Sequence, residues 1–269
     1  MNKSIKAIVA LLLSTLTLAS FSACSVDNKI VETASISVAA NKLKETIKDD
    51  EKANAAAEVK ISEEKVESDN EYVAVGIKFP VISGLKDKDL ETKLNATFKD
   101  NALKFKKNIE DMAKADFEAT KKDKEIVFRK YEVNTEYTVR YNKNNILSIT
   151  MIYYQYTGGA HGGSNQVAYN IDLKTGKTLL LPDIFEEGFD YKNVIINEIV
   201  KAIEEKKEDY FDYSVNVVKA IDENKSYYIE NGNIVVYFGQ YEIAPYAAGI
   251  PEFKIPFSKL KFKKGLGIN

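Results

Sequence analysis

Two segments of the chain carry residue types that do chemistry. The first covers residues 156–164, with the sequence YTGGAHGGS, and it holds four glycines and His161, the only histidine of the chain. Glycine tolerates positive φ and lets other groups approach the backbone closely, and histidine changes its charge near neutral pH. Two interpretations stay open. The loop presents its amides or its imidazole to a ligand, or it connects two strands while His161 satisfies buried carbonyl groups.

The second segment covers residues 237–251, with the sequence YFGQYEIAPYAAGIP, and it is too apolar and aromatic for an ordinary solvent-exposed loop. It folds back over the core or displays tyrosine and proline as a binding surface, and we favour the second interpretation. Tyrosine gives a large contact area at a low cost in side-chain entropy. The two segments together predict one partner-binding set: Tyr156, Gly158, Gly159, His161, Tyr241, Glu242, Pro245 and Tyr246.

In this set we expect the glycines to shape the loop and the tyrosines and Pro245 to supply contact area. His161 or Glu242 would supply directional hydrogen bonds. We predict no catalytic residue, no metal site and no cofactor, because a single histidine excludes the zinc motifs that need two. A triad of His161, Ser164 and a distant carboxylate lacks the spacing of a nucleophile elbow. Paired carboxylates for sugar hydrolysis stay open, since no pair stands out among 40 acidic residues.

The charge of the chain argues against nucleic acid as a partner. The formal net charge is −2, and only Arg129 and Arg140 among the 38 basic residues are arginines. No basic field therefore remains that would recruit a polyanion.

The amino terminus predicts export. Lys3 and Lys6 precede residues 7–23, which carry no charge and end in small residues before Cys24, the only cysteine. This is the layout of a secretory leader. The segment FSAC at residues 21–24 resembles a bacterial lipoprotein box, in which the cysteine is diacylated, although Phe21 replaces the usual leucine. We predict a signal peptide over 1–23, lipidation of Cys24, and anchoring to the outer face of the cytoplasmic membrane. Ordinary secretion and an uncleaved anchor are the alternatives.

Residues 24–60 have weak periodicity and predict a flexible tether. Beyond it, apolar residues recur at steps of three or four after Asp87, which predicts a long amphipathic helix with one face on a sheet. A second, shorter helix is expected over 191–205. Strands are expected at 71–79, 127–141, 146–156, 165–173, 227–230, 234–238 and 252–257.

Strands in hairpins and helices in separate blocks predict the α+β class, with antiparallel sheets packed against the long helix and the shorter one. We expect two domains, an amino-terminal α+β domain at 61–150 and a carboxy-terminal α+β domain at 151–269 that carries the two unusual segments.

Three strings carry a resemblance to a known family: YQYTGGAHG at 154–162, DLKTGK at 172–177 and YEIAPYAAG at 241–249. They resemble a paired domain-of-unknown-function family of bacterial exported proteins, over about residues 57–262. The same pair forms the extracytoplasmic region of lysozyme-sensing anti-sigma factors and the accessory region of some peptidoglycan deacetylases. The resemblance implies a lysozyme receptor that plugs the cleft of the enzyme with loop residues.

Only six residues precede the apolar run, where a sensor has a cytoplasmic sigma-binding segment, and the sequence shows no deacetylase domain after the pair. We therefore expect the accessory pair alone, as a non-catalytic surface lipoprotein of a Gram-positive-like cell. Its expected partner is a lysozyme-like muramidase or peptidoglycan. The alternative is a cell-wall hydrolase or deacetylase-type enzyme with His161 as general base. A third possibility is that the motifs are structural and that the partner surface lies elsewhere.

Overall fold

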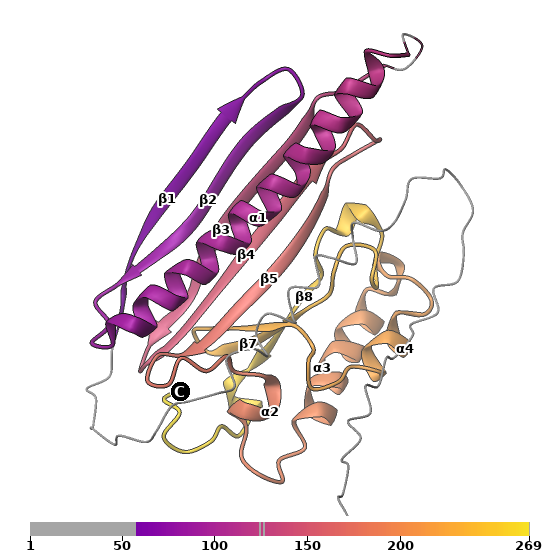
Figure 1. Cartoon of the computed structure of the whole chain (residues 1–269). Helices are drawn as coiled ribbons and strands as arrows, with labels where there is room; N and C mark the ends of the chain where they lie inside the picture. Colours follow the sequence, from indigo (N-terminus) through magenta and orange to yellow (C-terminus); the bar gives the residue numbers. More distant parts are fainter. Residues whose placement is uncertain (1–57, 124, 126, 269) are drawn as a thin grey trace, which may run out of the picture. The chain divides into compact units, whose positions relative to one another are not determined.

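The computed structural model describes residues 58–123, 125 and 127–268 (Figure 1). The predicted signal peptide, Cys24 and nearly all of the predicted tether lie outside the described residues. Within the described residues, no helix is both long enough and apolar enough to cross a membrane.

The first part of the described chain forms a five-stranded sheet in which neighbouring strands along the chain are also neighbours in space. Every pair is antiparallel except β2 with β3, which is parallel. A parallel pair needs a long crossover between its strands, and here a helix supplies it. The strands are β1 (Lys60–Asp69), β2 (Val73–Ser83), β3 (Tyr131–Lys143), β4 (Ile146–Tyr156) and β5 (Gly163–Asp172).

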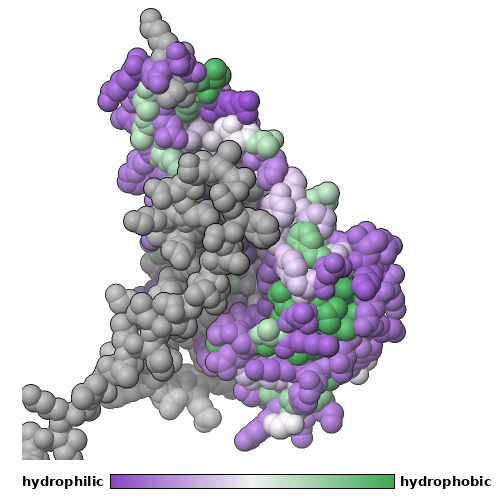
Figure 2. Space-filling view, turned by 90° about the vertical axis from the view of Figure 1, so that its right-hand side faces the viewer, coloured by the Kyte–Doolittle hydropathy of each residue, from purple (hydrophilic) through white to green (hydrophobic). Residues whose placement is uncertain are grey.

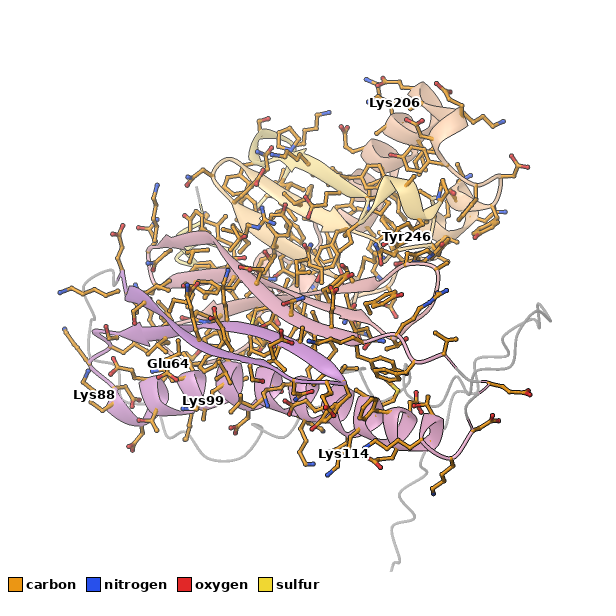
Figure 3. All side chains as sticks on the ribbon, turned by 90° about the horizontal axis from the view of Figure 1, so that it is seen from above. Glu64, Lys88, Lys99, Lys114, Lys206 and Tyr246 are labelled. Atoms are coloured by element: carbon orange, nitrogen blue, oxygen red, sulfur yellow. The ribbon has the colours of Figure 1, made fainter. Side chains whose placement is uncertain are left out.

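The crossover is α1 (Lys88–Thr120), which lies along one face of this sheet (Figure 1). It begins where the sequence predicts, because the Asp87 side chain accepts a hydrogen bond from the Leu90 amide, 2.9 Å away. The apolar stripe faces the strands, and Phe98 is fully buried with its ring edge-on to Tyr169 at 5.1 Å between centroids. The outer face is polar, and its Lys99 pairs with Glu64 of β1 at 3.3 Å (Figure 3).

The later part of the chain forms a three-stranded antiparallel sheet with helices beside it. A second buried cluster lies here, and it combines apolar residues of α3 with those of β6, β7 and β8. The elements are α2 (Leu181–Ile184), α3 (Tyr191–Glu205), α4 (Ser214–Lys219), β6 (Tyr227–Glu230), β7 (Asn233–Tyr237) and β8 (Glu252–Pro256), with 3-10 turns η4 (Lys207–Asp209), η5 (Tyr246–Ala248) and η6 (Phe257–Lys259).

Strand β6 joins the two sheets, since it contacts β3, β4 and β5. The junction contains a buried polar bridge. The Asn170 amide donates to the Tyr227 carbonyl at 2.8 Å, and the Ser148 hydroxyl donates to the Asn170 side-chain oxygen at 2.6 Å. Each buried polar group is thereby satisfied, which makes the bridge specific to one register.

The predicted α+β class is confirmed, with both predicted helices present and α3 within the predicted bounds. The structure differs from the prediction at β1, which occupies a segment where no strand was expected, and in the parallel pairing of β2 with β3. The predicted boundary between residues 150 and 151 falls inside β4, and the division into two domains at that point stays a prediction. The face seen in Figure 2 is mostly polar, and its largest group of apolar residues lies at the lower right.

Candidate functional site

The two unusual segments meet in space. The loop over residues 157–162 joins β4 to β5, and the segment over residues 238–251 joins β7 to β8. The backbone N–H of Ser164 donates to the side-chain oxygen of Gln240 at 2.7 Å. The Tyr246 hydroxyl donates to the Gly162 carbonyl at 2.9 Å, and Figure 3 places Tyr246 well away from α1. We call the cluster formed by these two segments the loop cluster.

His161 lies in the middle of the loop cluster. Its ring stacks on that of Tyr246, with centroids 3.8 Å apart and planes 23° apart. Its Nδ1 is 2.9 Å from the Gly162 carbonyl oxygen. A carbonyl only accepts, so in this contact Nδ1 carries the proton. In the tautomer with that single proton, Nε2 accepts from the Tyr241 hydroxyl, 3.2 Å away. The imidazole therefore satisfies a carbonyl, as the second interpretation expects, and is also exposed to solvent, while its presentation to a ligand stays a prediction.

Tyr241 has an unusual backbone conformation. Its φ is +63°, and the residue is 51% exposed. Positive φ is uncommon for a residue with a bulky side chain, because the Cβ atom approaches the following carbonyl oxygen. Such strain persists where the surrounding structure enforces it, and it is concentrated at ligand-binding sites. The structure thus holds a large aromatic side chain at the surface at a cost in backbone energy.

Glu242 is partly exposed and braces this turn. Its Oε2 accepts from the Gly239 backbone N–H at 2.6 Å, and its Oε1 accepts from the Lys225 ammonium at 2.8 Å. Lys225 lies over the Phe238 ring, 3.5 Å from its centroid. Burial lowers the pKa of Lys225, and the adjacent Glu242 carboxylate acts against that shift. Both oxygens of Glu242 are engaged within the chain, so we assign it to holding the turn that displays Tyr241.

The other predicted residues lie at the two margins of the loop cluster. The Gly159 carbonyl accepts from the Tyr156 hydroxyl at 3.2 Å, and Gly158 adopts a φ of +84°. Pro245 is exposed directly before η5.

Sequence reasoning missed Arg129, whose Nη1 donates to the Gly158 carbonyl at 3.1 Å. Its rarity was the available signal, because the chain has only two arginines.

Gly162 offers a test of how tightly the loop cluster is packed. A Cβ atom at Gly162 would lie 2.4 Å from the Tyr154 ring, whereas one at Gly163 would meet nothing within 4 Å. Gly162→Ala is expected to displace the Tyr154 ring and lower stability by about 1 kcal/mol or more. Gly163→Ala is the matched control and should melt within a degree or two of the parent. Equal melting temperatures for both variants, measured by calorimetry, would contradict this packing.

The arrangement suits contact better than catalysis. The hydrogen-bond partners of His161 are a tyrosine hydroxyl and a carbonyl, and no carboxylate or nucleophile bonds to its ring among the described residues. The described part of the chain also has no group of three His, Cys, Asp or Glu side chains that could hold a metal ion. What the cluster offers is aromatic surface with hydroxyl groups at its edge, the chemistry of a binding loop.

Comparison with known proteins finds two family models on this chain. A model described as "Deacetylase PdaC" matches residues 66–164, and one described as "Protein of unknown function (DUF3298)" matches residues 182–258. The first match ends at residue 164 and so contains the glycine-rich loop, whereas the domain prediction places that loop in the carboxy-terminal part. The loop cluster therefore combines one segment from each matched region.

Two curated relatives come from Bacillus subtilis strain 168. The anti-sigma-V factor RsiV is 28% identical over 209 residues, which are 74% of this chain and 66% of that protein. The peptidoglycan-N-acetylmuramic acid deacetylase PdaC is 22% identical over 197 residues, 72% of this chain and 39% of that protein. The chain thus spans less than two thirds of either relative.

A solved structure supports the fold. The crystal structure of a DUF3298 family member from Bacteroides fragilis covers 77% of this chain and 94% of its own, with a TM-score of 0.60 and 21% identity. The expected resemblance to the paired family is therefore confirmed. The chain carries a region similar to the deacetylase model, followed by a region similar to the DUF3298 model.

Proposed function

We propose that this chain is a non-catalytic binding module that acts outside the cytoplasm and docks on its partner through the loop cluster. The observation that carries the proposal is the aromatic group of His161 and Tyr241, which are exposed, and Tyr246, which is half-buried and stacks on the His161 ring. Two loops from distant parts of the sequence converge there, and one of them holds Tyr241 at positive φ. Rigid aromatic anchors of this kind dominate the energy of protein interfaces.

For the partner we propose a lysozyme-like muramidase or peptidoglycan. The support is the similarity to an anti-sigma factor and to a deacetylase whose name specifies peptidoglycan. Because the chain spans only part of each relative, the activities of the whole relatives do not transfer with the similarity. The loop cluster combines one segment from each of the two family matches, and it is where we place the contact.

Calorimetric titration of the purified chain with lysozyme, together with a pull-down on purified cell-wall sacculi, tests the partner. We expect a saturable heat of binding in the first experiment or retention in the second. Lys114 is an exposed residue of α1, outside the loop cluster, and supplies the control. Lys114→Ala should change neither the heat of binding nor the retention on sacculi. A chain that binds neither lysozyme nor sacculi would contradict both proposed partners.

The alternative function is a cell-wall hydrolase or deacetylase-type enzyme that uses His161 as general base. The exposure of the imidazole is what favours it. His161→Ala separates the two functions, because an enzyme would lose turnover by a factor on the order of 10² to 10⁴ while it kept its affinity for ligand. A binding module has no turnover to lose, and there the same change is expected to weaken binding.

The proposed location depends on Cys24. We propose that the mature chain begins at a diacylated Cys24, because two acyl chains give stable anchoring and one gives only marginal binding. In cells fed a labelled fatty acid, the parent and a Ser25→Ala control should both carry the label and sediment with membranes. Cys24→Ser should lose the label and leave the membrane fraction. Undiminished labelling of Cys24→Ser would exclude lipidation at this site.

A further inference from the structure

Arg129 lies at the edge of the loop cluster without a carboxylate partner. The residue is exposed, and its Nη1 donates to the carbonyls of Gly158 at 3.1 Å and Gly159 at 3.4 Å. No ion pair of Arg129 is found among the described residues, whereas its neighbour Lys130 pairs with Asp69. The other arginine is engaged within the fold, since the Nε of Arg140 donates to Thr150 at 2.9 Å. The structure therefore fixes one guanidinium at the loop and leaves most of its donors available.

The backbone of the glycine-rich loop has more hydrogen-bond donors than acceptors without a partner among the described residues. The carbonyls of Gly158, Gly159 and Gly162 all accept hydrogen bonds from side chains. By contrast, the backbone N–H groups of residues 158–162 donate to no acceptor within the described ranges. Gly159 is exposed and leaves the backbone open to close approach by a ligand, whereas Gly162 is buried against the Tyr154 ring. Three of the five carbonyls of residues 158–162 are thus used internally, while none of the five backbone N–H groups has a partner among the described residues.

Arg129 is the charged side chain that bonds directly to the glycine-rich loop, and the other charges nearby belong to Glu132 and to the Glu242–Lys225 pair. Glu132 is opposite Tyr156 in the β3–β4 ladder and makes no ion pair among the described residues. Glu242 is neutralised by Lys225 on the far side of the Tyr241 turn. The guanidinium is the group suited to a planar, two-oxygen acceptor, because its N–H donors form a fixed fork.

We propose that Arg129 and the glycine-rich loop form a carboxylate-binding subsite of the loop cluster. This proposal rests on the proposed function and adds the chemical group that the partner presents. Both proposed partners carry such groups. A muramidase has a pair of catalytic carboxylates in its cleft, and the peptides of peptidoglycan carry free carboxylates.

A titration with sodium acetate, at constant sodium concentration against sodium chloride, tests the subsite without any assumption about the partner. We expect the amide resonances of residues 158–162 in the isotope-labelled chain to shift saturably with acetate. Arg129→Gln should abolish the shifts, and Arg129→Lys should retain part of them. Lys130→Gln is the matched control, because it removes a neighbouring charge and should leave the shifts intact. Shifts that are absent from the parent, or equal in Arg129→Gln, would overturn the proposal.

A second experiment identifies the source of the carboxylate. Affinity is measured for lysozyme and for a lysozyme variant with amides in place of its catalytic carboxylates, and retention is measured on native and on amidated sacculi. Arg129→Gln should weaken binding to the native form of the true partner by about tenfold to a hundredfold, and the amide form should show no such difference. Equal binding by Arg129→Gln and the parent would refute the subsite. Failure of the parent to bind either partner would refute the proposed function instead, and the acetate titration would still decide the subsite.

Discussion

Tyr241→Gly is expected to weaken partner binding by roughly 30-fold to 1000-fold and to leave the melting temperature unchanged or higher. The loss reflects the removal of an exposed aromatic anchor, which in interfaces is worth about 2–4 kcal/mol. Stability should not fall, because glycine adopts positive φ without the cost of about 1–2 kcal/mol that a tyrosine pays at φ +63°. Calorimetric titration and thermal unfolding of the same samples measure both effects.

Two control variants separate the contribution of the ring from that of the backbone. Tyr241→Ala removes the ring but keeps a Cβ atom at positive φ, so it should bind as weakly as the glycine variant and melt at a lower temperature. Tyr213 is 49% exposed, close to the value for Tyr241, but its φ is −89°. Tyr213→Ala should leave affinity unchanged. If Tyr241→Gly bound normally and melted several degrees lower, the residue would be structural and the loop cluster would not be the contact surface.

Glu242→Gln is expected to lower the free energy of unfolding by roughly 2–3 kcal/mol at pH 7. The change leaves the Lys225 ammonium, whose side chain is only 11% exposed, without its carboxylate partner. It also weakens the brace on the Tyr241 turn, so partner affinity should fall with stability. Urea unfolding with linear extrapolation measures the loss. Asp111→Asn breaks a pair whose side chains are 71% and 65% exposed, and it should change stability by less than about 0.5 kcal/mol.

The pH dependence of this loss has a defined sign. Burial lowers the pKa of Lys225 in the folded chain, and the Glu242 carboxylate is the main group that opposes the shift. Without that carboxylate the folded pKa of Lys225 falls further below its unfolded value of 10.5. Between the two values the unfolded chain binds more protons, so stability rises with pH. The deficit of Glu242→Gln against the parent should therefore shrink as pH increases from 7 to 9.5. A deficit that stays constant or grows would contradict this assignment.

The double variant Lys225→Met with Glu242→Gln gives the corresponding control. Replacement of the buried ammonium by an apolar side chain removes the unpaired charge, so part of the lost stability should return. The double variant should also lose the gain of stability with pH that Lys225 gives to Glu242→Gln, because the titrating group is gone. A double variant less stable than Glu242→Gln would show that packing of Lys225, rather than its charge, dominates.

The elements with strong periodicity could be predicted from the sequence. The stripe that begins at Leu90 and the cap at Asp87 define α1, because 3.6-residue periodicity and a capping carboxylate act locally. Strand β1 could not be predicted in the same way. Most of its residues are exposed, and only Ile61 and Val66 are partly buried, so no alternation marks it. An edge strand of this kind is held mainly by backbone pairing with β2, which leaves little trace in residue types.

The candidate site could be predicted by residue type but not by role. Histidine among glycines and a tyrosine-rich loop singled out two segments, and the structure brings them together. The ion pair of Glu242 depends on Lys225, which lies on another segment and has no local signal. The positive φ of Tyr241 is likewise a property of the closed turn and not of the residue. Arg129 reaches the loop only because the sheet brings the start of β3 beside the end of β4.

Hydrogen–deuterium exchange of the full chain, measured with and without saturating lysozyme or soluble peptidoglycan fragments, locates the contact directly. Docking through the loop cluster predicts slower exchange in peptides covering residues 157–164 and 239–249, with α1 unaffected. Slower exchange confined to α1 or to the outer edge of β1, with the two loops unchanged, would contradict the assignment.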